Sequence, residues 1–179
     1  MKLKHIVITL LLAASTGWAG PIEDAAAAYK SKNYVAAAKG FRLAAAQGNA
    51  TAQVMLGAMY ANGQGVVQDY AEAVKWYRLA AAQGNASAQS ELGVMYANGQ
   101  GVVQDDAEAV KWFRLAAAQG VARAQYNLGV SYANGQGVIQ DYAEAVKWYR
   151  LAAAQGHTSA QSNLGVMYDN GQGVVQDYA

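Results

Sequence analysis

Hydrophobic, small and polar positions recur along the chain with a fixed period. Residues 70–105 read YAEAVKWYRLAAAQGNASAQSELGVMYANGQGVVQD, and residues 106–141 and 142–177 repeat this segment with few changes. Residues 34–69 form a more diverged copy, in which Gly40 stands where the later copies have tryptophan. Copies in register predict a repeat protein, in which each unit buries its apolar face against its neighbours.

Each copy predicts two helices joined by a short turn. The first helix begins at Asn85, a favourable N-cap, and ends before Gly99, which can adopt the left-handed conformation that closes a helix. The second helix begins at Asp105, which is followed by Glu108 in a pattern that resembles a capping box, and ends at Gly120. Alanine and leucine fill both interiors, and no segment has the alternating pattern of a strand.

A glycine recurs in the middle of each first helix, where it is about 1 kcal/mol less favourable than alanine. Its repetition at Gly57, Gly93, Gly129 and Gly165 predicts that another helix crosses closely at this point. The expected fold is therefore all-α, a right-handed α/α superhelical solenoid of helix-turn-helix repeats.

One motif runs through the copies: A-x-x-x-L-G-x-x-Y-x-x-G-x-G-V-x-x-D-x-x-x-A-x-x-W-x-x-x-A-A-x-x-G. A complete example is carried by Ala88, Leu92, Gly93, Tyr96, Gly99, Gly101, Val102, Asp105, Ala109, Trp112, Ala116, Ala117 and Gly120. The motif resembles the Sel-one-like repeat (SLR), a relative of the tetratricopeptide repeat, over residues 34–179. We expect such repeats over residues 49–179, the last one incomplete, and a tetratricopeptide-like capping helix pair over residues 20–48. The resemblance implies a scaffold or adaptor that binds proteins, a common role among exported bacterial proteins of this kind.

The first 19 residues have the features of a secretory signal peptide. Lys2 and Lys4 precede the largely apolar residues 6–14, and Gly17 and Ala19 supply the small side chains that signal peptidase needs. The apolar run is shorter than the roughly 20 residues that span a bilayer. We expect cleavage after Ala19 and a periplasmic or secreted chain that no longer contacts the membrane.

The chain ends at residue 179, just after Asp177, which would cap a further helix. The helix over residues 157–170 is therefore expected to lack its partner. We predict either a truncated chain or a homodimer that forms through this incomplete C-terminal repeat.

The copies differ from one another on one face of the first helix. The opposite face, with Gln53, Leu56, Gly57 and Tyr60, is identical in every copy, which indicates packing. The variable face has two interpretations: a solvent surface that drifts freely, or the concave binding groove that helical solenoids offer to partners. Few charges lie on it, which favours the groove. Its residues are Thr51, Val54, Met55, Ala58, Ser87, Ser90, Glu91, Val94, Arg123, Tyr126, Asn127, Val130, Ser159, Ser162, Asn163 and Val166.

We expect this groove to bind a partner protein, with Arg123 and Tyr126 as anchors, because arginine and tyrosine are enriched at interface hot spots. A cell-wall or glycan-binding module is the alternative, since the repeated Tyr60 position could offer rings to sugars. The spacing of these tyrosines fits the packed face of the helix better than an exposed sugar-binding surface. A β-lactam hydrolase is a further alternative, because some proteins that the chain resembles are described so. Those proteins are cysteine-rich, and this chain has no cysteine.

Catalytic and metal chemistry have no candidate residues in the sequence. No serine is followed by lysine three residues later, and residues 129–133 lack the last glycine of a nucleophile elbow. His157 is the single histidine after residue 19, and metal ligands do not cluster. The formal net charge of +1 provides no basic stripe for nucleic acid. We therefore expect neither an enzyme nor a cofactor, a metal or a nucleic-acid partner.

Overall fold

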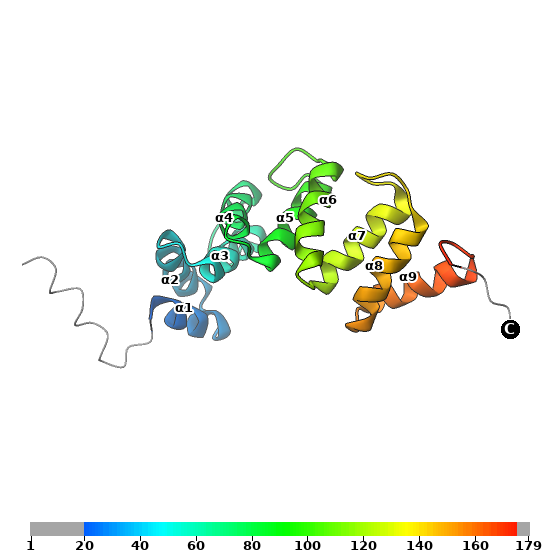
Figure 1. Ribbon diagram of the computed structural model, residues 1–179. Coiled ribbons are helices and arrows are strands. Elements are labelled where there is room, and N and C mark those ends of the chain that lie inside the picture. The colour runs from blue at the N-terminus through cyan, green and yellow to red at the C-terminus, as the bar shows by residue number, and fades with distance from the viewer. Residues whose placement is uncertain (1–19, 175–179) are drawn as a thin grey trace, which may run out of the picture.

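A computed structural model describes residues 20–174, and this part of the chain forms consecutive helices without β-strands (Figure 1). Neighbouring helices pack against each other, so the molecule is a stack that runs from α1 at one end to α9 at the other. The all-α solenoid predicted from the sequence is thereby confirmed. The helices are α1 (Pro21–Lys30), α2 (Tyr34–Ala46), α3 (Ala50–Asn62), α4 (Tyr70–Ala82), α5 (Ala86–Asn98), α6 (Asp106–Ala118), α7 (Ala122–Asn134), α8 (Tyr142–Ala154) and α9 (Thr158–Asp169).

The ends of α5 and the start of α6 show how far the helix boundaries follow the predicted pattern. Asn85 caps α5 by accepting a backbone hydrogen bond at 3.0 Å, and Gly99 ends this helix with a φ of 66°. Asp105 caps α6 by accepting the backbone N–H of Glu108 at 2.9 Å. The capping box is only half formed, because the Glu108 carboxylate pairs with Lys111 at 2.7 Å. The backbone N–H of Asp105 donates instead to a carbonyl of α5.

Gly57, Gly93 and Gly129 lie where an aromatic ring of the following even-numbered helix crosses. A Cβ atom at Gly57 would lie 2.8 Å from Cε1 of Tyr77, and the ring of Phe113 covers Gly93 in the same way. A larger residue would have to displace a ring in a close-packed interior. The close helix crossing is therefore confirmed at these three glycines, whereas among residues 20–174 no helix crosses at Gly165.

Two polar links also recur from copy to copy. The buried Gln89 donates to the Ala81 carbonyl at 3.4 Å and accepts a hydrogen bond from Gln119 at 2.7 Å. Arg78 of α4 donates to the hydroxyl of Tyr96 in α5 at 2.6 Å. These links explain why glutamine and tyrosine are identical in all copies. Equivalent bonds join Gln83 to Gln53, Gln155 to Gln125, Arg42 to Tyr60, Arg114 to Tyr132, and Arg150 to Tyr168.

The corresponding face of α9 is open within residues 20–174. No atom would approach within 4 Å of a Cβ at Gly165, and Val166 and Tyr168 are 54% and 42% exposed. Leu164 is half-buried, whereas its counterpart Leu56 is fully buried. Among the described residues this face of α9 is less covered than the same face of α3, and the incomplete last repeat stays a prediction. The homodimer through this end stays a prediction, which sedimentation of the purified chain would test.

At the other end, α1 and α2 pack on α3 around the buried Phe41. Trp76 of α4 packs against this core, and the later tryptophans likewise pack on the preceding helix pair. The buried residues of α2 occupy the same positions as those of α4, and they are Ala37, Ala38, Phe41, Ala44 and Ala45. The departure at Gly40 therefore leaves the packing of α2 intact.

The predicted signal peptide, residues 1–19, lies outside the described residues. Among the helices of residues 20–174, none combines the length and the apolar character that crossing a membrane requires.

Candidate binding groove

The variable positions lie along the odd-numbered helices at different depths. Ser90 is buried, and its hydroxyl has no hydrogen-bond partner within the described chain. The exposed positions are Thr51, Ser87, Arg123, Ser159, Ser162 and Val166. The half-buried positions are Val54, Met55, Ala58, Glu91, Val94, Tyr126, Asn127, Val130 and Asn163. Most of the half-buried apolar side chains pack partly on the protein's own core, so this face is not uniformly solvated.

Three cavities open along this face, each between one odd-numbered helix and its neighbours. An N-terminal cavity of about 390 Å³ lies among α1, α2 and α3 and is mostly apolar, with Met55 in its lining. A central cavity of about 300 Å³ lies among α5, α6 and α7 and includes Arg123 and Asn127. A C-terminal cavity of about 490 Å³ lies among α7, α8 and α9 and includes Tyr126. Val130 of α7 lines both of the last two cavities, so the two cavities adjoin at this residue.

The two charged residues of the variable face form an ion pair between α5 and α7. Nη1 of Arg123 lies 2.5 Å from Oε1 of Glu91, and the two side chains are 51% and 33% exposed. A pair of this exposure contributes at most about 1 kcal/mol, so its main effect is to position Arg123 at the central cavity. Burial raises the pKa of the Tyr77 hydroxyl, the Glu91 carboxylate raises it further, and Arg123 partly opposes both.

Tyr126 is held by stacking rather than projecting freely. Its ring centroid lies 4.6 Å from that of His157 and 5.8 Å from that of Tyr149. Burial raises the pKa of Tyr149, and a hydrogen bond of 3.2 Å from the Asn163 amide opposes this shift. Among residues 20–174 no charged side chain lines the C-terminal cavity, so it suits uncharged apolar or amide groups of a ligand.

The central cavity also has lining residues outside the variable face predicted from the sequence. Asn98 at the end of α5, Asp106 and Phe113 of α6, Ser131 of α7 and Gln136 of the following turn all line the central cavity. The signal available in the sequence was the difference between copies, because Asp106, Phe113 and Ser131 each depart from the neighbouring copies.

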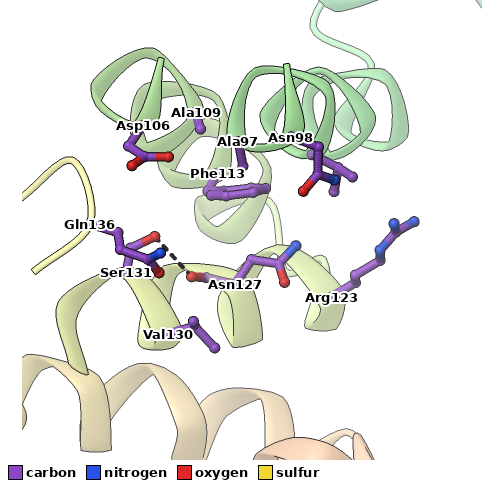
Figure 2. A pocket seen from close by; sticks show the side chains of 11 residues that line it. Ala97, Asn98, Asp106, Ala109, Phe113, Arg123, Asn127, Val130, Ser131 and Gln136 are labelled. Atoms are coloured by element: carbon purple, nitrogen blue, oxygen red, sulfur yellow. Dashed lines mark hydrogen bonds between the residues drawn. The ribbon is translucent and has the colours of Figure 1, made fainter. Parts of the chain in front are cut away.

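Figure 2 shows how the side chains of the central cavity are arranged. The amides of Asn98 and Asn127 point toward each other across the opening, while Asp106 and Arg123 lie on opposite sides of them. The ring of Phe113 lies between the two helices that carry the asparagines. The arrangement can bind a ligand, with amide donors and acceptors in the middle and charges of opposite sign at the ends.

The remaining candidates have structural roles in the described residues. The ring of His157 accepts the backbone N–H of Ala160 at 3.3 Å and so caps α9. The Tyr96 hydroxyl accepts a hydrogen bond from Arg78, and this contact supports a packing role for the tyrosine rather than stacking on a sugar. Across residues 20–174, no group of three or more His, Cys, Asp or Glu could hold a metal ion.

Stacked helix pairs with a groove along one helix of each pair define a helical-repeat solenoid. The Sel1 repeat family matches residues 50–85, 86–121, 122–157 and 158–179, and the chain belongs to this family. Sel1 repeats typically mediate protein–protein interactions and are generally non-catalytic scaffolds.

Solved structures agree with this assignment. A protective antigen of uropathogenic Escherichia coli with an SLR fold is 46% identical, with a TM-score of 0.85, over 87% of this chain and 34% of its own. A Sel1 repeat protein from Oxalobacter formigenes is 40% identical, with a TM-score of 0.80, over 86% of this chain and 63% of its own. The chain therefore spans less than two thirds of either relative. No curated protein matches the sequence.

Proposed function

We propose that this chain is an exported scaffold or adaptor that binds a partner protein along the groove of its odd-numbered helices. The observation that carries the proposal is the division of each odd-numbered helix into two faces. The face that is identical in every copy packs against neighbouring helices and makes hydrogen bonds to them, such as Gln119 to Gln89 and Arg78 to Tyr96. The variable face opens into cavities that contain Arg123 and Tyr126. Solenoids use such extended surfaces for partners, and Sel1 repeats typically mediate protein–protein interactions.

Site-specific photo-crosslinking tests this proposal in the cells that make the protein. A photoreactive residue in place of Ser87 or Ser159 would lie on the variable face, and both positions are exposed. The matched control replaces Leu115 of α6, which is 50% exposed but outside the variable face. We expect discrete cross-links to a protein from the first two positions and none from the control. Equal cross-linking from all three positions would contradict the groove as the binding surface.

The anchors are tested in the same experiment. Arg123→Ala and Tyr126→Ala should each weaken the cross-link from Ser159, because both side chains line the groove. The glycan alternative gives a different result: binding to purified peptidoglycan that survives both substitutions, with no protein cross-linked.

Export is the second part of the proposal and rests on the sequence of residues 1–19. Mass spectrometry of the protein from its native cells should find a chain that begins at Gly20. Recovery of a chain that still carries the apolar residues 6–14 would contradict export through this signal.

A further inference from the structure

The copy over residues 106–141 departs from its two neighbours in a concentrated way. At six positions the copies before and after it agree with each other and this copy differs: Asp106, Phe113, Arg123, Tyr126, Ser131 and Ile139. Of these, Asp106, Phe113, Arg123 and Ser131 all line the central cavity. Free drift would scatter such changes over the surface, as it has at Ile139, which is 91% exposed.

The four changes act together on one space. Serine replaces the methionine of the neighbouring copies at Ser131, which removes bulk from the cavity wall, and its hydroxyl bonds to the Asn127 carbonyl at 3.1 Å. Phenylalanine replaces tyrosine at Phe113, which removes a hydroxyl. In the next copy, the hydroxyl of Tyr149 accepts the amide of Asn163.

The amide of Asn127 has no such partner, so its donor and acceptor face the cavity free of internal bonds within residues 20–174. The Asn98 amide, on the other side of the opening, likewise makes no internal side-chain bond in this part of the chain (Figure 2). A pair of unengaged amides matches the alternating N–H and C=O groups of an extended peptide backbone.

The other two changes place opposite charges at the two sides of these amides. Asp106 replaces a tyrosine at the first turn of α6, where the helix dipole favours a carboxylate, and it makes no ion pair inside the described chain. Arg123 replaces a serine and uses Nη1 for Glu91, which leaves further guanidinium donors for a ligand. Charge complementarity therefore calls for a cation near Asp106 and an anion near Arg123.

We infer that the central cavity binds an extended peptide segment of the partner, holding its backbone between Asn98 and Asn127, a basic side chain at Asp106 and an acidic side chain at Arg123. This inference rests on the proposed function and names the chemistry of the partner. An extended segment fits because the central cavity adjoins the C-terminal cavity at Val130, and the described lining of that second cavity is uncharged, so neighbouring residues of the same peptide can lie there.

The test uses synthetic capped peptides and the full mature chain. The charged set is Ac-Ala-Lys-(Ala)n-Asp-Ala-NH2 with zero to three central alanines, together with the same peptides in reversed order. The neutral set replaces lysine by glutamine and aspartate by asparagine. Binding is followed by two-dimensional ¹H–¹⁵N NMR, which detects millimolar affinities and reports on the Asn98 and Asn127 side-chain amides directly.

We expect at least one charged peptide to shift the Asn98 and Asn127 amide signals and its neutral counterpart to bind about tenfold more weakly, the combined effect of two partly exposed ion pairs. The variant D106Y/R123S restores the residues of the neighbouring copies, so it should fold. It should bind the charged peptide about tenfold more weakly than the parent chain does. The matched control I139V restores a neighbouring residue on an exposed turn and should bind as the parent does.

Equal binding of charged and neutral peptides, or unchanged affinity in D106Y/R123S, would overturn the inference. So would shifts confined to Tyr126 and Asn163 of the C-terminal cavity. If the photo-crosslinking described above captures a protein while no peptide shows charge-dependent binding, the scaffold function stands and this inference fails.

Discussion

The same substitution should stabilise the protein at one of two equivalent glycines and not at the other. Gly129 and Gly165 lie in the identical segment Asn-Leu-Gly-Val of α7 and α9. A Cβ at Gly129 would lie 2.6 Å from Cδ1 of Tyr149, whereas a Cβ at Gly165 would meet nothing within 4 Å. The two glycines therefore have the same neighbours in sequence, and they differ in that the ring of Tyr149 crosses over Gly129 alone.

The expected magnitudes follow from two opposing effects. Alanine is favoured over glycine inside a helix by about 1 kcal/mol, so Gly165→Ala should raise the free energy of unfolding by about that amount. The same gain at Gly129 is opposed by overpacking against the ring, which costs about 1–3 kcal/mol. Gly129→Ala should therefore leave the free energy of unfolding unchanged or lower it by up to about 2 kcal/mol.

Urea unfolding followed by far-UV circular dichroism measures both variants against the parent chain. Because α9 is a terminal helix that can open by itself, hydrogen exchange of its amides should accompany the unfolding curves. An equal gain in stability for the two alanine variants would show instead that the ring of Tyr149 imposes no steric limit at Gly129.

Three further outcomes are expected. Val121 caps α7 without a side-chain bond, so Val121→Asn, which introduces the cap that Asn85 provides for α5, should raise the free energy of unfolding by about 1 kcal/mol in urea titrations; no gain would contradict the capping argument. Gln125→Leu removes a buried side chain with partners on two helices and should cost about 1–3 kcal/mol, more than Gln161→Leu at an exposed position, as compared by thermal melts. Because burial raises the pKa of Tyr77, the unfolded chain ionises first above about pH 10, so stability should fall as pH rises from there. Tyr77→Phe should reduce this loss of stability, measured as the urea midpoint at several pH values above about 10. An unchanged dependence of the midpoint on pH would mean that other groups cause the loss.

The sequence predicts the architecture well because the copies serve as internal controls. Asn85, Gly99 and Asp105 end and begin helices by local backbone chemistry, which needs no knowledge of the tertiary structure. Gly57, which recurs in every copy, predicts a crossing helix because glycine is unfavourable inside a helix and is expected there only where a close neighbour leaves no room for a side chain. Each of these inferences concerns one helix or one turn.

The candidate site is less predictable because it depends on how neighbouring helices are placed. A helical wheel puts Ser90 on the variable face, but the helices packed around α5 bury this residue. Glu91 and Arg123 come from different copies, and their ion pair follows from the spacing of α5 and α7 rather than from either helix. Asp106 enters the cavity from an even-numbered helix, which a wheel of α7 does not include.

The bonds that join neighbouring helices have a consequence for how this molecule can change in length. Among the described residues, the longest-range side-chain hydrogen bonds, such as Tyr29 to Gln64, span 35 residues, which is less than one copy. Chain closure over such short separations needs little entropy, which favours rapid folding. A duplication or loss of one entire copy would restore the recurring glutamine–glutamine and arginine–tyrosine bonds at the new junction, so the groove could be lengthened or shortened by one copy at a time.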